Sequence, residues 1–155
     1  MQRRLILVAG AGVCVLPAWA HHGWSNFDAE RPIYLEGRAA KVAWRNPHAE
    51  VELELASPLT LPSDLAKRPV PPQSAAVDAP AILAKTVLPT RRDKRWELEL
   101  APLSRMQAWQ VAEIKPGTSL AVVAYTFPGE KGEAVARVEY LFVDGKAYAL
   151  RSSPA

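Results

Sequence analysis

Residues 50–55, Glu-Val-Glu-Leu-Glu-Leu, alternate acidic and apolar side chains, and residues 96–100, Trp-Glu-Leu-Glu-Leu, repeat this alternation. A period of two places the apolar side chains on one face of a strand and the charged ones on the other, so both stretches predict half-buried β-strands. The alternation favours a solvated acidic face over paired catalytic carboxylates. The acidic residues expected to face solvent are Glu50, Glu52, Glu54, Glu97 and Glu99.

Further alternating or apolar stretches surround this pair of strands. Residues 33–44 predict a long strand with Gly37 at a bend or bulge, and Asn46-Pro47 predicts the turn that ends it. Three more strands are expected at 120–127, 134–143 and 146–150. A short helix is expected to begin with Ser104 as its cap and to run to about Glu113, ahead of Lys-Pro-Gly at 115–117.

Five or six strands with one short helix after the third are the element order of a small closed or partly open barrel. The oligonucleotide/oligosaccharide-binding (OB) barrel is the common fold closest to this order, so the predicted fold class is mainly β and OB-like. Trp44, Trp96 and Trp109 stand at strand and helix positions and are expected to belong to the core rather than to line a ligand groove.

Residues 57–92 differ in composition, since they hold seven of the chain's 14 prolines and show little periodicity. The segment is expected to be a long surface insertion, either partly disordered or packed over the barrel as irregular extended chain. It ends in the basic run 91–95, Arg-Arg-Asp-Lys-Arg. A solvated loop base is favoured for this run over an anion-binding or membrane-surface patch.

Residues 1–20 have the three regions of a cleavable secretion signal: two arginines, an apolar run from Leu5 to Leu16, and Pro-Ala-Trp-Ala at 17–20. The apolar run is much shorter than the roughly 20 residues of a membrane-spanning helix, so cleavage after Ala20 is favoured over retention as an anchor. A single OB-like domain at 21–155 then remains. It is expected to be periplasmic or secreted, with no stable membrane anchor after processing.

The charge balance bears on the partners of this domain. Losing Arg3 and Arg4 from the 19 basic residues leaves 17 against 16 acidic residues, and a near-neutral chain is poorly suited to bind nucleic acid. The one cysteine, Cys14, leaves with the signal, so neither a disulfide nor a thiolate ligand is expected in the processed chain.

The chain has three histidines, and two of them, His21 and His22, would open the processed chain. An N-terminal histidine offers its α-amine and its ring Nδ1 to one metal ion, and a remote imidazole, that of His48, can complete a flat nitrogen site. Such a site favours copper(II), although zinc or nickel can use the same ligands. The return to His48 requires the segment after His22 to fold back along the barrel, with Trp24 and Phe27 as its apolar anchors.

The sequence Ala-His-His-Gly-Trp-Ser at 20–25, together with Asn-Pro-His at 46–48, resembles a family of exported bacterial proteins of unknown function. Stretches 96–99 and 114–120 resemble further segments of that family. Here Gly23 replaces the commoner small hydroxyl residue, and the proline-rich insertion is longer than usual. The resemblance implies export and the fold, and it implies no activity.

Three functions follow from these patterns. The favoured hypothesis is a metal-binding protein, with copper held by His21, His22 and His48 as metal ligands and with no catalytic residue. The alternative is a non-enzymatic periplasmic adaptor that binds a peptide or protein partner on the barrel. The least favoured is a copper-dependent oxidative enzyme, because an exposed aromatic substrate face near the metal would rest on Trp24 alone.

Overall fold

Six strands form one sheet in the computed structural model, which describes residues 23–155. The strands are β1 (Ile33–Ala43), β2 (Glu50–Leu55), β3 (Arg95–Glu99), β4 (Ser119–Thr126), β5 (Val135–Val143) and β6 (Lys146–Ala149). Each lies within one or two residues of a stretch that the sequence predicted to be a strand. The local pattern therefore determines where the strands are.

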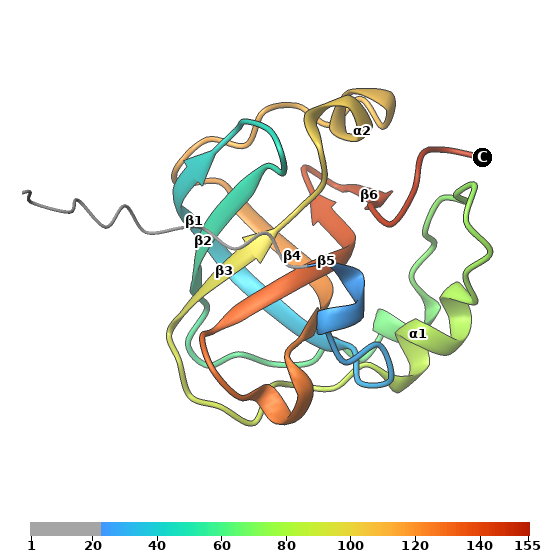
Figure 1. Cartoon of the computed structure of the whole chain (residues 1–155). Helices are drawn as coiled ribbons and strands as arrows, with labels where there is room; N and C mark the ends of the chain where they lie inside the picture. The colour runs from blue at the N-terminus through green and yellow to red at the C-terminus, as the bar shows by residue number, and fades with distance from the viewer. Residues whose placement is uncertain (1–22) are drawn as a thin grey trace, which may run out of the picture.

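The sheet closes on itself (Figure 1). β1 pairs with both β2 and β4, β2 pairs with β3, and β4 pairs with β5, all antiparallel. A parallel pairing of β3 with β5 completes a five-stranded circuit, and β6 extends the sheet beyond β5. The circuit β1-β2-β3-β5-β4 is the strand order of an OB-type barrel, which confirms the predicted OB-like fold.

Gly37 stands where β1 passes from one neighbour to the other, since its backbone pairs with Leu55 of β2 and with Leu120 of β4. A Cβ atom on Gly37 would lie 1.9 Å from the carbonyl oxygen of Glu54, so only glycine allows this close approach. The irregularity in β1–β2 pairing itself falls later, between Ala39 and Lys41.

The interior of the barrel is apolar. Trp96 and Leu98 of β3 and Leu53 of β2 are fully buried, which confirms the inward face that their alternation predicted. Trp44 and Trp109 are only partly buried and pack against this core.

The expected helix after β3 is shorter than predicted and begins without the expected cap. α2 covers Leu103–Ala108, and Pro102, not Ser104, is its N-cap residue, with no side-chain cap hydrogen bond. The chain leaves the helix at Trp109, and Gln110 has a φ of 53°, so the helical spacing of Val111 and Ile114 does not continue the helix. Both residues are buried against the barrel core instead.

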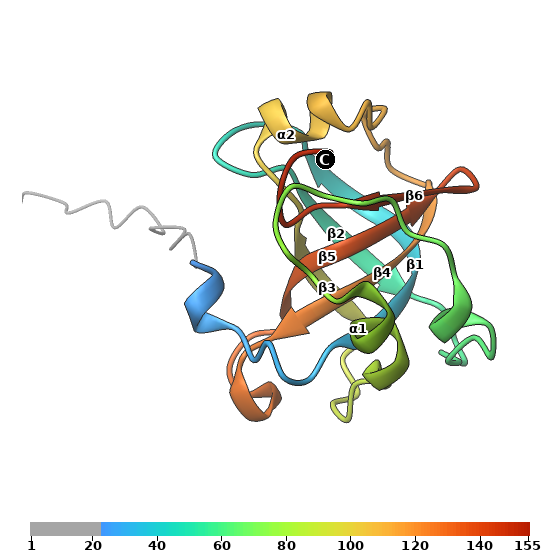
Figure 2. The same cartoon turned by 90° about the vertical axis from the view of Figure 1, so that its right-hand side faces the viewer.

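The insertion 57–92 has more regular structure than its composition indicates. It contains the 3-10 helix η2 (Leu65–Lys67) and the helix α1 (Ala79–Lys85), so residues 23–155 form two short α-helices where the sequence predicted one. The insertion passes over the outer face of the barrel (Figure 2). There Leu65, Ile82 and Leu83 are buried in a second apolar cluster with Tyr34 and Tyr140.

Candidate functional site

The first described residues fold back onto the barrel. The 3-10 helix η1 (Trp24–Asn26) lies in front of β5 in Figure 1. Phe27 is 5% exposed and stacks on Phe127, with ring centroids 5.1 Å apart. Trp24 meets the ring of Tyr125 edge to face at 6.3 Å. The predicted fold-back, with Trp24 and Phe27 as its apolar anchors, is confirmed.

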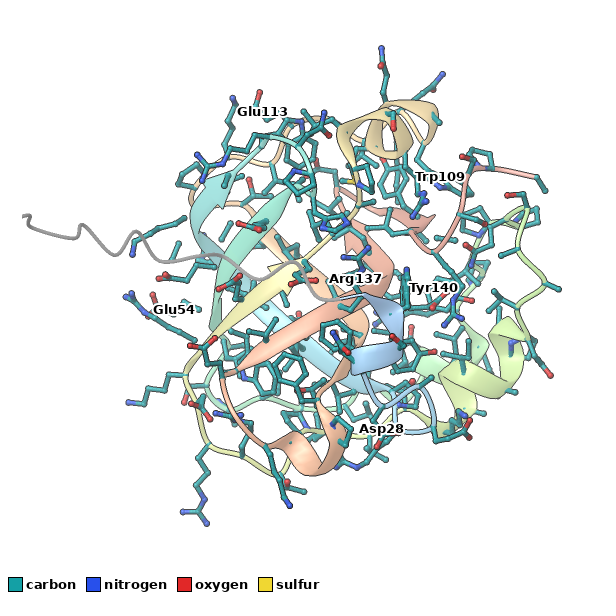
Figure 3. All side chains as sticks on the ribbon, viewed as in Figure 1. Asp28, Glu54, Trp109, Glu113, Arg137 and Tyr140 are labelled. Atoms are coloured by element: carbon teal, nitrogen blue, oxygen red, sulfur yellow. The ribbon has the colours of Figure 1, made fainter. Side chains whose placement is uncertain are left out.

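Two guanidinium groups lie over the ring of Trp24. The Cζ atom of Arg137 is 5.1 Å from the ring centroid, and the Cζ atom of Arg151 is 4.7 Å from it. Cations at this distance are attracted to the negative face of an indole ring, so the N-terminal segment is held by electrostatic contacts as well as by apolar ones. Figure 3 shows Arg137 on β5 beside this segment.

Arg137 also joins two side chains from other elements. Its Nη1 donates to Glu99 Oε2 at 3.1 Å, and each of these two side chains is 5% exposed. Its Nη2 lies 3.2 Å from His48 Nε2. A guanidinium group only donates, so Nε2 accepts, and the ring proton of the neutral imidazole is then on Nδ1. Burial lowers the pKa of Arg137, and the hydrogen bond to Glu99 opposes that shift.

We call Trp24, His48, Glu99 and Arg137 the Trp24 site. It lies on the outer face of the barrel, where β3 and β5 run side by side and the N-terminal segment covers them. Glu99 pairs with Arg137 in the register of these two strands. The expectation that Glu99 faces solvent is wrong. The side chain is on the outward face, as its alternation requires, but the residue is 4% exposed and paired with Arg137.

A second ion pair lies beside the Trp24 site. In the β4–β5 register, Val123 pairs with Tyr140 and Ala124 with Val138, so Glu139 is the extra residue of a β-bulge. Glu139 is fully buried and accepts hydrogen bonds from Arg151 Nε at 2.8 Å and from Gln73 Nε2 at 3.1 Å.

The ion pair of Glu139 and Arg151 shifts the pKa of Arg151 itself and that of the neighbouring Tyr125. Burial acts to lower the pKa of Arg151, but the hydrogen bond and the charge of Glu139, with a smaller contribution from Tyr125, together outweigh it and the pKa is raised. Burial also raises the pKa of Tyr125, and the negative charge of Glu139 adds to that shift.

Of the three predicted metal ligands, only His48 belongs to the part of the chain that the structure describes. His21 and His22, like the predicted signal at 1–20, lie outside the described residues. Among residues 23–155, no group of three or more His, Cys, Asp or Glu side chains could hold a metal ion. His48 contributes one imidazole, and its described partner at Nε2 is Arg137.

Sequence reasoning missed the buried ion pairs. Arg137 and Glu139 stand two residues apart in β5, a spacing that on an unbulged strand indicates one solvated face. The available signal is weak: both interrupt an otherwise apolar strand. Their partners Glu99 and Arg151 are 38 and 12 residues away in the sequence, so the pairing depends on the closed barrel and on the bulge.

The fold and site together define a small closed β-barrel whose outer face carries a buried, charge-paired site under its N-terminal segment. Residues 9–60, about a third of the chain, match the model of a family described as a family of unknown function (DUF6152). This match confirms the expected resemblance to a family of unknown function, and it spans all three histidines. No curated protein and no solved structure matches the chain. None of the helices described at 23–155 is both long enough and apolar enough to cross a bilayer.

Proposed function

We propose that this chain is an exported metal-binding protein that holds copper at His21 after removal of residues 1–20, with His22 and His48 as further ligands. The observation that supports this proposal is the contact series from Trp24 to Arg137 to His48. It anchors the segment that directly follows His22 beside the one described histidine.

Chain geometry allows the ligands to meet. Consecutive Cα atoms are about 3.8 Å apart, so the Cα of His21 lies within roughly 11 Å of the Cα of Trp24. From the Trp24 ring it is 5.1 Å to the guanidinium carbon of Arg137, whose Nη2 is 3.2 Å from His48 Nε2. These lengths are short enough for a ligand at residue 21 or 22 to reach the His48 ring.

The ligand set favours copper. A free α-amine and the Nδ1 atom of the same histidine chelate one ion, and a second imidazole adds a third nitrogen. Copper(II) prefers nitrogen ligands in a tetragonal arrangement and stands above nickel and zinc in general affinity. Before cleavage the nitrogen of His21 is an amide, which lacks the free lone pair of an amine. Proteolytic removal of residues 1–20 would therefore complete the site, in the periplasm or outside the cell.

The test compares two proteins that differ only at the terminal nitrogen: a chain that begins at His21 with a free α-amine and the same chain with that amine acetylated. Both are titrated with copper(II) by calorimetry, and the bound ion is examined by electron paramagnetic resonance. We expect one tight equivalent with nitrogen ligands in the first protein and at least tenfold weaker binding in the second. Equal copper uptake by both, or no uptake by either, would overturn the proposal.

His48→Gln provides the matched ligand variant. The Oε1 atom of glutamine can accept from Arg137 near the position of Nε2, so the fold should tolerate the change. Glutamine is a poor copper(II) ligand compared with imidazole, so we expect copper affinity to fall by about tenfold or more without a change in unfolding midpoint. Unchanged affinity would remove His48 from the ligand set.

A hollow of about 510 Å³ on the outer face of the barrel favours the second candidate function, a non-enzymatic adaptor for a peptide or protein partner. Its lining includes Tyr34, Phe142 and Ala121, with Arg68 and Lys146 among its charged residues. The copper titration separates the two candidates, because an adaptor needs no metal. If copper binds, oxygen consumption in the presence of a reductant distinguishes the third candidate, an oxidative enzyme, from a carrier.

A further inference from the structure

We propose that Arg137 is a built-in competitor of the metal: its guanidinium group occupies the cation's place at His48, and the incoming ion must displace it. This inference rests on the proposed function. It assigns to Arg137 the role of an affinity-determining residue that is not itself a ligand.

The contacts of Arg137 resemble those of a bound cation. The guanidinium group bridges a nitrogen donor atom, His48 Nε2, at 3.2 Å and an oxygen donor atom, Glu99 Oε2, at 3.1 Å. Imidazole nitrogen and carboxylate oxygen are the atoms that divalent metals take as ligands. The side chains of Arg137 and Glu99 are each only 5% exposed, so water does not readily take the guanidinium's place.

One lone pair cannot serve two partners. The neutral imidazole of His48 has a single acceptor nitrogen, and Nε2 uses it for Arg137. The other ring nitrogen, Nδ1, has less than 1 Å² of exposed surface and carries the ring proton, so Nε2 is the ring atom left for a metal ion. Ligation by His48 Nε2 therefore requires that the hydrogen bond from Arg137 break.

Arg137 can leave His48 without becoming an unpaired buried charge. The salt bridge to Glu99 and the face of the Trp24 ring both remain available to it. Displacement thus costs one charge-assisted hydrogen bond, which corresponds to about tenfold in affinity. The penalty is the same for every metal. At low free concentrations it leaves the site to the ion with the highest intrinsic affinity for nitrogen ligands.

The first test replaces Arg137 by lysine in the processed protein that begins at His21. A lysine keeps the positive charge opposite Glu99, but its single ammonium group does not span both acceptors as the planar guanidinium does. We expect copper(II) affinity to rise about tenfold. Arg95→Lys is the matched control: Arg95 lies on β3 and pairs with Glu52 at the surface, so copper affinity should not change.

A second variant tests whether the result with lysine comes from altered folding or from repulsion between the lysine charge and the metal ion. Glu99→Gln combined with Arg137→Met removes the buried charge pair as a unit and leaves no donor opposite His48. We expect this double variant also to bind copper(II) more tightly than the unchanged protein. Unchanged or weaker binding in both Arg137 variants would overturn the inference.

A metal-free measurement separates this inference from the proposed function. Nitrogen NMR of the metal-free protein should show His48 protonated at Nδ1, and the Arg137→Met double variant should lose this strict preference. An Nε2–H tautomer in the unchanged protein would overturn the role of Arg137 whatever copper does. If instead the Nδ1–H tautomer is present and copper does not bind at all, it is the proposed function that fails.

Discussion

Glu130 shows at the scale of one residue how the long insertion is attached. Its carboxylate is 4% exposed and accepts hydrogen bonds from the backbone N–H groups of Thr90 and Arg91 at 2.9 Å. It also forms an ion pair with Arg31. One side chain from the link between β4 and β5 therefore holds the end of the insertion and the segment before β1.

We expect Glu130→Gln to lower the free energy of unfolding by about 2 kcal/mol, because a buried charge-assisted network loses its ion pair and one of its acceptors. Urea unfolding at neutral pH measures the change. Glu133→Gln is the control: Glu133 is exposed in the same link, so its side chain should contribute little. An equal, small effect of both substitutions would contradict the role of Glu130.

The same carboxylate makes stability depend on acidity. Burial acts to raise the pKa of Glu130, but the hydrogen bonds from Arg91, Thr90 and Arg31 outweigh it and lower the pKa below 4.5. A lowered pKa contributes stability above the unfolded-state value, and that contribution is lost as the pH falls through the folded-state value. We expect unfolding free energy to fall more steeply below pH 4.5 in the unchanged protein than in Glu130→Gln. Parallel pH profiles would contradict this.

Buried tyrosines set the alkaline limit. Burial, followed by contact with Glu36, raises the pKa of Tyr34 to about 12, and burial together with the charge of Glu139 raises that of Tyr140 to about 12. A raised phenol pKa contributes stability that is complete below pH 10 and is lost as the pH rises through about 12. Ultraviolet titration should show these phenols ionising only near pH 12, with loss of circular dichroism. Ionisation near pH 10 in a folded protein would contradict the buried positions.

At the scale of elements, the sequence predicts all six strands, β2 and β3 from the alternation of acidic and apolar residues, and β4 from an apolar run that is buried on both faces. The length of α2 could not be predicted, since Val111 and Ile114 have helical spacing yet are buried from a loop. The helix α1 in the insertion has a recognisable N-terminal capping sequence, but the high proline content of the whole segment led us to expect irregular chain. Asp78 caps α1 by accepting from the backbone N–H of Ala81, with proline at the first turn.

The insertion should contribute to stability through its apolar contacts. Leu83 of α1, within the insertion, is 3% exposed. We expect Leu83→Ala to cost about 2–3 kcal/mol of unfolding free energy. Leu61 is 41% exposed in the same insertion, so Leu61→Ala should cost much less. Denaturant unfolding of both variants measures the difference. Equal effects would show that the insertion does not stabilise the barrel.

Adding a single methyl group at Gly37 should strongly reduce the stability of the sheet. The added Cβ would meet the backbone of Glu54 at 1.9 Å, and backbone on both sides is fixed by pairing. We expect Gly37→Ala to cost about 3 kcal/mol or more. At Gly23 the nearest atom to such a Cβ, Ser25 Oγ, is 3.8 Å away, so Gly23→Ala should leave thermal stability nearly unchanged. A stable Gly37→Ala protein would contradict the close approach.

At the scale of the whole molecule, the sequence predicts part of the candidate site. The return of the N-terminal segment to the barrel, with Trp24 and Phe27 as its anchors, was expected from the sequence only as a requirement of the metal hypothesis, and the structure contains it. The ion pairs were not predictable, because Glu99 and Arg137 become neighbours only when β3 and β5 pair across the closed sheet. An outward-facing charge is solvated or buried according to what covers it, and strand periodicity carries no information about the cover.

The parallel β3–β5 pairing also fixes the order in which the molecule can be completed. β3 ends at Glu99 and β5 begins at Val135. When the chain is delivered from its N-terminus, one edge of β3 therefore has no strand to pair with until residues 135–143 have followed. Such an unpaired strand is open to other chains. Slow emergence would thus prolong the hazard of intermolecular association, and a holding chaperone would act most usefully in the interval between these two strands.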